Sequence, residues 1–130
     1  MIERITIESA PKNIAPYVHA VRAGQFYFIT GQMPIVPGTE EYELGSIELQ
    51  TSRVMENLLI ILSALGLSID SVVQVRAFLT NMNDFDRFNA VYKKFFGNGL
   101  PARTCVGVSG LAGGASVEVD MIAFDDKTLK

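Results

Sequence analysis

The chain has 130 residues, which is enough for one domain that buries roughly two thirds of its unfolded surface. Its 48% hydrophobic and 19% charged residues are typical of a globular chain and exclude disorder for all but the ends. A net charge of -3 with scattered basic residues disfavours a nucleic-acid partner. We therefore predict a single domain over residues 1–130.

Short apolar segments separated by turn residues fill the N-terminal part of the chain. They predict strands at residues 2–7, 18–22 and 26–30, with Ala23-Gly24-Gln25 as a hairpin turn. The opening segment carries early charges, and the longest apolar run, residues 58–62, is far too short to cross a bilayer. We expect a cytoplasmic protein, in agreement with a single cysteine that cannot form an internal disulfide.

Two helical patterns follow. Apolar residues recur at helical spacing over residues 47–65, with Ser46 as the N-cap and Gly66 just beyond the end. A second stripe, which is mostly aromatic, begins after residue 83 or 84 and stops at Gly97. Both patterns predict amphipathic helices.

Strand patterns separate and follow the helices. The segment between the helices alternates. This predicts a strand in which Val72 and Val73 lie on opposite faces, with Val73 on the same face as Val75. Further strands are expected at residues 104–109 and 116–124. The glycine-rich stretch Leu111 to Ala115 is interpreted as a hairpin turn between them.

About six strands and only two helices predict an α+β domain in which the helices cover one face of a sheet. The strand at 26–30 is apolar on both sides, with Phe26 and Phe28 opposed to Tyr27 and Ile29. Because a large apolar face in water would be a sticky patch, we expect identical subunits to cover it in a closed homo-oligomer. Clefts between subunits are then the expected sites for a small molecule.

Few residues of this chain could form a metal centre or a covalent catalyst. A protein-ligated metal needs three or four converging ligands, whereas the chain has one histidine, His19, and one cysteine, Cys105. We interpret Cys105 as a small core residue and His19 as a hydrogen-bonded or solvated structural residue. The glycines after Cys105 lack the pattern of a phosphate-binding loop. We therefore expect no metal and no cofactor.

Arg103 and Glu118 each have two interpretations. Arg103 follows Leu100-Pro101 at the start of a strand, where its planar guanidinium could bind a carboxylate or form a structural ion pair with a neighbouring acidic residue. Glu118 shares a strand face with Asp120, which is typical of a wet face. If that face is enclosed, Glu118 could accept a proton from a bound water.

Five motifs in a fixed order extend over nearly the whole chain. They are IAPY at 14–17, ITGQMP at 29–34, NDFDRFNAVYKKFF at 83–96, PARTC at 101–105 and SVEVDMIAF at 116–124. In these motifs the chain resembles the RidA (YjgF) family of imine deaminases. The resemblance implies a chorismate-mutase-like α+β fold, with a six-stranded mixed sheet, two helices on one face, and a homotrimer whose sheets face inward beside three intersubunit clefts.

The resemblance also implies an activity and a set of site residues. Well-characterised members hydrolyse reactive 2-imino and 2-enamino acids to 2-keto acids and ammonia, which removes reactive intermediates of amino-acid metabolism. By resemblance, Arg103 binds the substrate carboxylate, Glu118 positions or activates the attacking water, and the main-chain carbonyl of Cys105 assists. The other residues implied to line the cleft are Tyr17, Thr30, Gly31 and Asn89.

Two departures from the family pattern concern the choice of substrate. Thr30 stands where many deaminating members have serine, and Ala112 stands where proline is common. Two other functions are considered beside the deaminase: a regulatory trimer that binds a small carboxylate without turnover, and an endoribonuclease or translation inhibitor. The acidic pI near 5.1 and the single histidine disfavour RNA cleavage.

Overall fold

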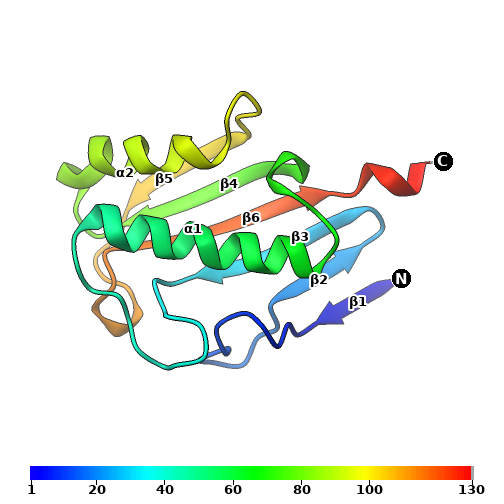
Figure 1. Cartoon of the computed structure of the whole chain (residues 1–130), viewed down its shortest axis with the longest axis horizontal. Coiled ribbons are helices and arrows are strands. Elements are labelled where there is room, and N and C mark those ends of the chain that lie inside the picture. The colour runs from blue at the N-terminus through cyan, green and yellow to red at the C-terminus, as the bar shows by residue number, and fades with distance from the viewer. Residues whose placement is uncertain (130) are drawn as a thin grey trace.

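The computed structural model describes residues 1–129, which form one sheet and a layer of helices (Figure 1). The strands are β1 (Ile2–Ile5), β2 (Ala20–Ala23), β3 (Phe26–Gln32), β4 (Val72–Leu79), β5 (Ala102–Gly107) and β6 (Val117–Phe124). The helices are α1 (Ile47–Ala64) and α2 (Phe85–Tyr92), and a 3-10 turn over Lys93–Phe95 extends α2. None of the helices formed by these residues is both long and apolar enough to span a bilayer.

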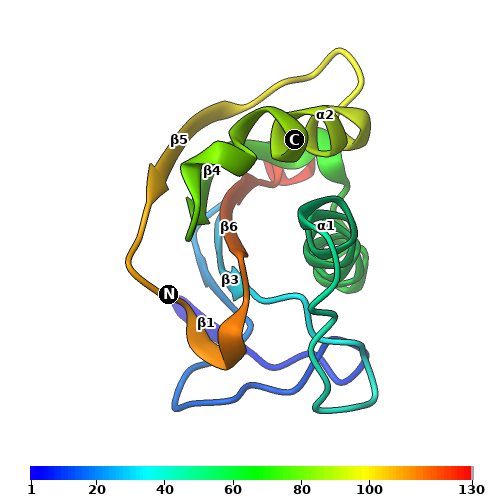
Figure 2. The same cartoon turned by 90° about the vertical axis from the view of Figure 1, so that its left-hand side faces the viewer.

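The six strands have the order β1-β2-β3-β6-β4-β5. β4 and β5 run parallel, and every other neighbouring pair is antiparallel. Both helices pack on the same side of the sheet, and the opposite side is open (Figure 2). The prediction of a six-stranded mixed sheet with two helices on one face is therefore confirmed.

Local signals set the ends of both helices. The Ser46 side chain accepts a hydrogen bond from the Leu49 N–H at 3.2 Å and caps α1, and Gly66 follows its last turn. α2 begins after Asp84, and its final part tightens into a 3-10 turn that ends before Gly97. Both predicted helices are confirmed.

The hydrophobic core lies between α1 and the central strands. Val54, Leu58 and Ile61 of α1 are fully buried, as are Val117 and Val119 of β6. Helical spacing in α1 and alternate spacing in β6 direct these side chains into the same layer. Each of them contributes roughly 1.5–3 kcal/mol by leaving water. This layer holds the sheet rigid beneath the residues of the open face.

The predicted alternation of β4 is wrong at its first residues. The register of β4 against β6 shifts between Val72 and Gln74, so that Val72 is buried and Val73 is 44% exposed. A bulge of this kind inserts one residue into a strand and reverses the side on which the residues before it lie. The pattern of apolar residues does not mark the bulge.

The predicted hairpin at Leu111 to Ala115 is also wrong. β5 pairs with β4, whereas β6 lies between β3 and β4, so β5 and β6 are not neighbours. The connection contains a 3-10 turn at Ala112–Gly114. Sequence patterns indicate strands, but the pairing of strands depends on the whole sheet.

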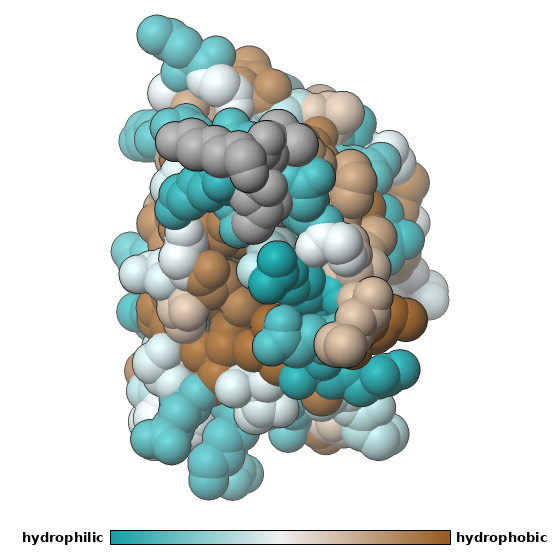
Figure 3. All heavy atoms as spheres, turned by 90° about the vertical axis from the view of Figure 1, so that its right-hand side faces the viewer, coloured by the Kyte–Doolittle hydropathy of each residue, from teal (hydrophilic) through white to brown (hydrophobic). Residues whose placement is uncertain are grey.

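The face of the sheet opposite the helices is partly apolar. Phe26, Phe28 and Val106 are 43%, 47% and 42% exposed there. Apolar side chains also gather at the end of the molecule that carries the C-terminus (Figure 3). The expectation of one uncovered face with apolar residues is therefore confirmed, and this open face carries the first part of the candidate site.

Candidate functional site

Glu118 lies on the open face, in the second position of β6 and beside an irregular part of β3. The β3–β6 register shifts between Ile29 and Gln32, so Thr30 and Gly31 fall within a bulge. A side chain at Gly31 would collide with the Glu118 carboxylate. The glycine therefore allows that carboxylate to lie directly against the bulge.

The surroundings of Glu118 favour its protonated form. Burial is the main cause that raises the pKa of Glu118, and the neighbouring Asp120 charge raises it further, while Arg76 opposes the shift. Arg76 is itself committed to Asp120, because its Nε lies 3.1 Å from both carboxylate oxygens and its Nη2 lies 2.6 Å from one. Glu118 is thus a half-buried carboxyl group whose pKa is raised above its ordinary value, as is common for carboxyl groups that transfer protons.

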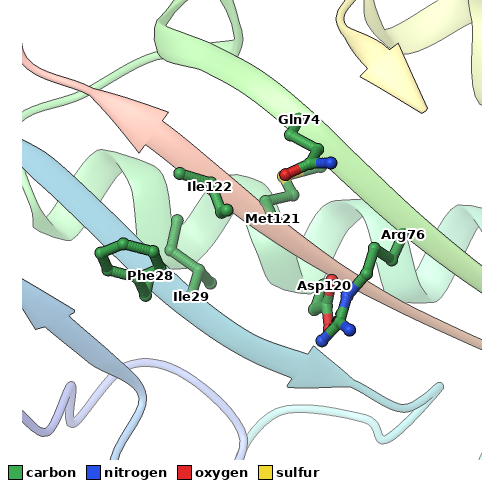
Figure 4. A pocket seen from close by; sticks show the side chains of 7 residues that line it. All are labelled: Phe28, Ile29, Gln74, Arg76, Asp120, Met121 and Ile122. Atoms are coloured by element: carbon green, nitrogen blue, oxygen red, sulfur yellow. Dashed lines mark hydrogen bonds and ion pairs between the residues drawn. The ribbon is translucent and has the colours of Figure 1, made fainter. Parts of the chain in front are cut away.

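Two adjoining cavities hollow the open face. The larger, of about 680 Å³, is lined by Tyr17, Thr30 and Gly31 together with Arg76 and Asp120. The smaller, of about 350 Å³, is shown in Figure 4, where the side chains of Arg76 and Asp120 point toward each other across β4 and β6. Its lining residues are Phe28, Ile29, Gln74, Arg76, Asp120, Met121 and Ile122.

Arg103 lies near the start of β5, as predicted, and β5 is an edge strand of the sheet. Its guanidinium carbon lies 5.7, 5.5 and 4.8 Å from the ring centres of Phe85, Phe88 and Tyr92 of α2. Within residues 1–129, no carboxylate forms an ion pair with Arg103. The ion-pair interpretation therefore has no support among the described residues, and the half-buried cation lies against aromatic rings instead.

Cys105 and Asn89 accompany Arg103. Cys105 is half-buried against the core, and burial raises the pKa of its thiol while the Arg103 charge opposes the shift. Asn89 lies four residues after Phe85 on the same side of α2. Its Oδ1 is buried, and it has no hydrogen-bond partner in the described part of the chain. Among the described residues, the Asn89 oxygen thus lacks a donor, and it lies in the same region as the Arg103 guanidinium, which lacks an anionic partner.

The strand register separates these two groups of residues. Arg103 pairs with Val75 of β4, whereas Glu118 pairs with Phe78. Val75 points into the core and Phe78 to the open face, so Arg103 and Glu118 lie on opposite faces of one sheet. The residues implied by the resemblance are not brought together within one chain. They form two half-sites, one around Glu118 with Tyr17, Thr30 and Gly31, and one around Arg103 with Cys105 and Asn89.

Comparison with known proteins identifies the family. Residues 7–125 match the family described as endoribonuclease L-PSP. The chain is 45% identical over 126 residues to a RutC family protein of Pyrococcus horikoshii, a match that covers 97% of this chain and 100% of the relative. It also matches the crystal structure of the YjgF gene product of Escherichia coli, with a TM-score of 0.87, 33% identity and coverage of 94% of this chain and 98% of that one. The chain belongs to the RidA (YjgF) family.

A second solved structure similar to this RidA-family chain is that of Escherichia coli TdcF with bound serine. Its TM-score is 0.87 at 35% identity, and the match covers 94% of this chain and 98% of that one. The RidA fold implied by the motifs is confirmed. The roles implied for Arg103, Glu118 and Cys105 stay predictions, because membership of the family does not define the reaction.

Tyr42 is a residue near the Glu118 half-site that the sequence analysis missed. It pairs with Ile35 in an isolated β-bridge, and its ring lies against Gly113, where a side chain would collide with it. Burial raises the pKa of Tyr42, and the nearby Tyr17 and Glu118 raise it further. The only sequence signal was the glycine-rich stretch that departs from the family pattern, since Gly113 makes room for this ring.

Proposed function

We propose that this RidA-family protein is a cytoplasmic enamine and imine deaminase that hydrolyses reactive 2-imino acids to 2-keto acids and ammonia. The observation that carries the proposal is Arg103, a half-buried guanidinium without an acidic partner among the described residues, held against three aromatic rings at a sheet edge. A planar guanidinium that has several N–H donors and no anionic partner is suited to bind the carboxylate of a ligand through two hydrogen bonds. The serine bound to TdcF carries such a carboxylate.

The proposed reaction needs orientation and one base. Arg103 holds the substrate carboxylate, and Glu118 accepts a proton from a water whose oxygen attacks the imine carbon. The carbon–nitrogen bond then breaks with transfer of a proton to nitrogen, so imine and water give the keto acid and ammonia. Because an imine carbon is already electrophilic, positioning supplies much of the rate advantage. The raised pKa of Glu118 favours its action as the base near neutral pH.

The separation of the two half-sites supports assembly into a homotrimer. Since Arg103 and Glu118 lie on opposite faces of one sheet, a site that uses both requires the Arg103 edge of one subunit to meet the Glu118 face of another. The open face carries exposed Phe26 and Phe28, which a neighbouring copy would cover. A monomer at micromolar concentration in sedimentation velocity would contradict this assembly.

The test is an imine-hydrolysis assay with matched arginine variants. A threonine dehydratase generates 2-iminobutanoate, and ammonia release is followed with wild type, Arg103→Ala and Arg87→Ala. Arg87 is the control because it lies on the surface of α2 and pairs with Asp84 at 2.7 Å. We expect wild type and Arg87→Ala to accelerate release, and Arg103→Ala to lose at least about a hundredfold in kcat/KM. Equal rates for all three proteins would refute the proposal.

The two other functions differ from the deaminase in binding behaviour and in the position of a possible acid or base. Saturable binding of a keto acid by wild type, without any acceleration of ammonia release, would support the regulatory carboxylate-binding trimer. RNA cleavage would require a base or acid that reaches RNA, and His19 is unsuited to this because it is buried. Its Nδ1 accepts a hydrogen bond from the Ile7 N–H at 2.8 Å, and its Nε2 lies 2.7 Å from the Pro11 carbonyl. His19 therefore has the structural role expected from the sequence.

A further inference from the structure

Arg103 is held in a seat made of three rings from one helix. Phe85, Phe88 and Tyr92 project from α2 toward β5, and Tyr92 is the nearest to the guanidinium carbon, at 4.8 Å. Tyr92 is itself packed between Phe88 and Phe96, with ring centres 5.5 and 4.7 Å away. A ring clamped on two sides cannot turn away from the cation it supports.

The rings restrain the guanidinium only in part. Attraction between a cation and an aromatic face is directed along the ring normal, so it holds the guanidinium plane against the seat. It distinguishes poorly between rotations of the fork within that plane. A fork that grips a carboxylate through two parallel hydrogen bonds needs that rotation to be defined as well.

The Tyr92 hydroxyl is the polar group that can define the rotation. Tyr92 is 4% exposed, and its hydroxyl is buried. Burial raises the pKa of Tyr92, whereas the nearby Arg103 guanidinium opposes the shift, so the phenol stays protonated beside the guanidinium. The buried hydroxyl has no hydrogen-bond partner of good geometry among the described residues, and the Arg103 guanidinium carbon lies 4.8 Å from the centre of its ring. Because a guanidinium has only donors, an Arg103 N–H turned toward this phenol oxygen would donate to it and give the buried acceptor its partner.

We propose that Tyr92 is a positioning residue for carboxylate recognition, whose hydroxyl fixes the rotation of the Arg103 fork while the rings of the seat fix its plane. This inference rests on the proposed function, in which Arg103 binds the substrate carboxylate. Tyr92 acts through Arg103, which binds the carboxylate, whereas the water is activated on the other face of the sheet at Glu118. Loss of the hydroxyl should therefore weaken binding and leave the chemical step nearly unchanged.

The chain offers a matched control for the removal of one phenol oxygen. Tyr27 is also buried, at 6% exposure, and also lies beneath an arginine, with the Arg22 guanidinium carbon 5.6 Å from its ring centre. Tyr27→Phe and Tyr92→Phe both keep the ring and remove only the hydroxyl. Phe85→Leu, at a half-buried ring of the seat, keeps an apolar side chain of somewhat smaller volume and removes one aromatic face.

The test combines calorimetric titration of 2-oxobutanoate with steady-state imine hydrolysis. We expect Tyr92→Phe to bind the keto acid about tenfold more weakly and to raise KM about tenfold with kcat within about twofold of wild type. Tyr27→Phe should match wild type, and Phe85→Leu should bind about threefold more weakly. The thermal midpoint of Tyr92→Phe should stay close to that of wild type, which separates positioning from general loss of the fold.

Two outcomes would overturn the inference in distinguishable ways. If Arg103→Ala abolishes keto-acid binding while Tyr92→Phe and Phe85→Leu bind as wild type does, the seat has no positioning role and the proposed function stands. If Arg103→Ala binds as wild type does, the carboxylate anchor is wrong and the inference falls with it. Should Tyr92→Phe fail to fold, wild-type binding by Phe85→Leu still refutes the seat, which is the part of the inference that does not depend on the hydroxyl.

Discussion

Gly31→Ala tests the Glu118 half-site without replacing Glu118 itself. Gly31 has an ordinary backbone conformation, so alanine is compatible with its φ angle. The new methyl group would collide with the end of the Glu118 side chain, whose next atoms, Cδ and Cγ, lie 2.9 and 3.2 Å from the methyl position. Relief requires the carboxylate to move by about 1 Å, a misplacement that costs roughly a hundredfold in rate.

The stability effect of this substitution should be small. The obstacle is the flexible end of a side chain, and the backbone gains rigidity in the unfolded state when glycine becomes alanine. We therefore expect kcat for imine hydrolysis to fall about a hundredfold, while the free energy of unfolding in urea changes by less than about 1 kcal/mol. The matched control is Gly110→Ala, where the methyl group meets no atom within 4 Å and φ is ordinary.

A Gly31→Ala variant with wild-type kcat would refute the reasoning. It would mean that the Glu118 carboxylate moves without consequence, and hence that Glu118 does not act on the attacking water. A large loss of stability would instead mean that the bulge of β3 rejects the methyl group, and in that case both kcat and the urea midpoint would fall together.

Three further predictions concern charge, a buried amide and the Tyr42 contact. Because the folded-state pKa of Glu118 is raised, wild-type turnover should fall as pH decreases through that pKa. Glu118→Gln should turn over at least about a hundredfold more slowly at neutral pH; it should also unfold at higher urea concentration than wild type, by a margin that grows as pH rises from the ordinary pKa of glutamate to the raised folded-state pKa and is full above it, because ionisation opposes folding there. Asn57→Ala should cost about 2–3 kcal/mol in urea unfolding, because the buried Nδ2 donates to two carbonyls of the β3–α1 connection at 3.1 and 2.8 Å; a cost below about 0.5 kcal/mol would contradict this role. Gly113→Ala and Gly114→Ala both introduce backbone strain, because φ is +66° and +75° at these positions, but only Gly113 contacts the Tyr42 ring. Gly113→Ala should therefore be less stable than Gly114→Ala by about 1–2 kcal/mol in urea unfolding. Equal urea midpoints would mean that the ring moves freely.

Much of the fold follows from local patterns that lie within a few residues of each other. The α1 boundaries agree with the prediction because Ser46 supplies a cap and Gly66 follows the last turn, and both act within four residues of the helix end. The hairpin at Gly24 is confirmed for the same reason, since Ala23 pairs directly with Phe26 across the turn. The errors at Val73 and at the connection before β6 concern pairings between distant segments.

The candidate site shows the same division. The motifs identified Arg103 and Glu118, and the sequence correctly placed Arg103 near the start of a strand, whereas its place at the edge of the sheet came from the structure. It did not indicate that the two side chains lie on opposite faces, because that depends on how β5 and β6 each register against β4. It also indicated the aromatic stripe of α2 only as a helix face, and gave no reason to connect Tyr92 with Arg103.

The sequence by itself determined the helices, the order of apolar and turn segments, the family and one uncovered sheet face, because each depends on residue type and short-range spacing. Only the tertiary structure decided that Arg103 has no anion among the described residues, that three rings hold it, and that Gly31 admits the Glu118 carboxylate against the β3 bulge. These contacts join residues far apart in the chain, and their geometry is set by strand register and packing. The burial that raises the pKa of Glu118 arises in the same way.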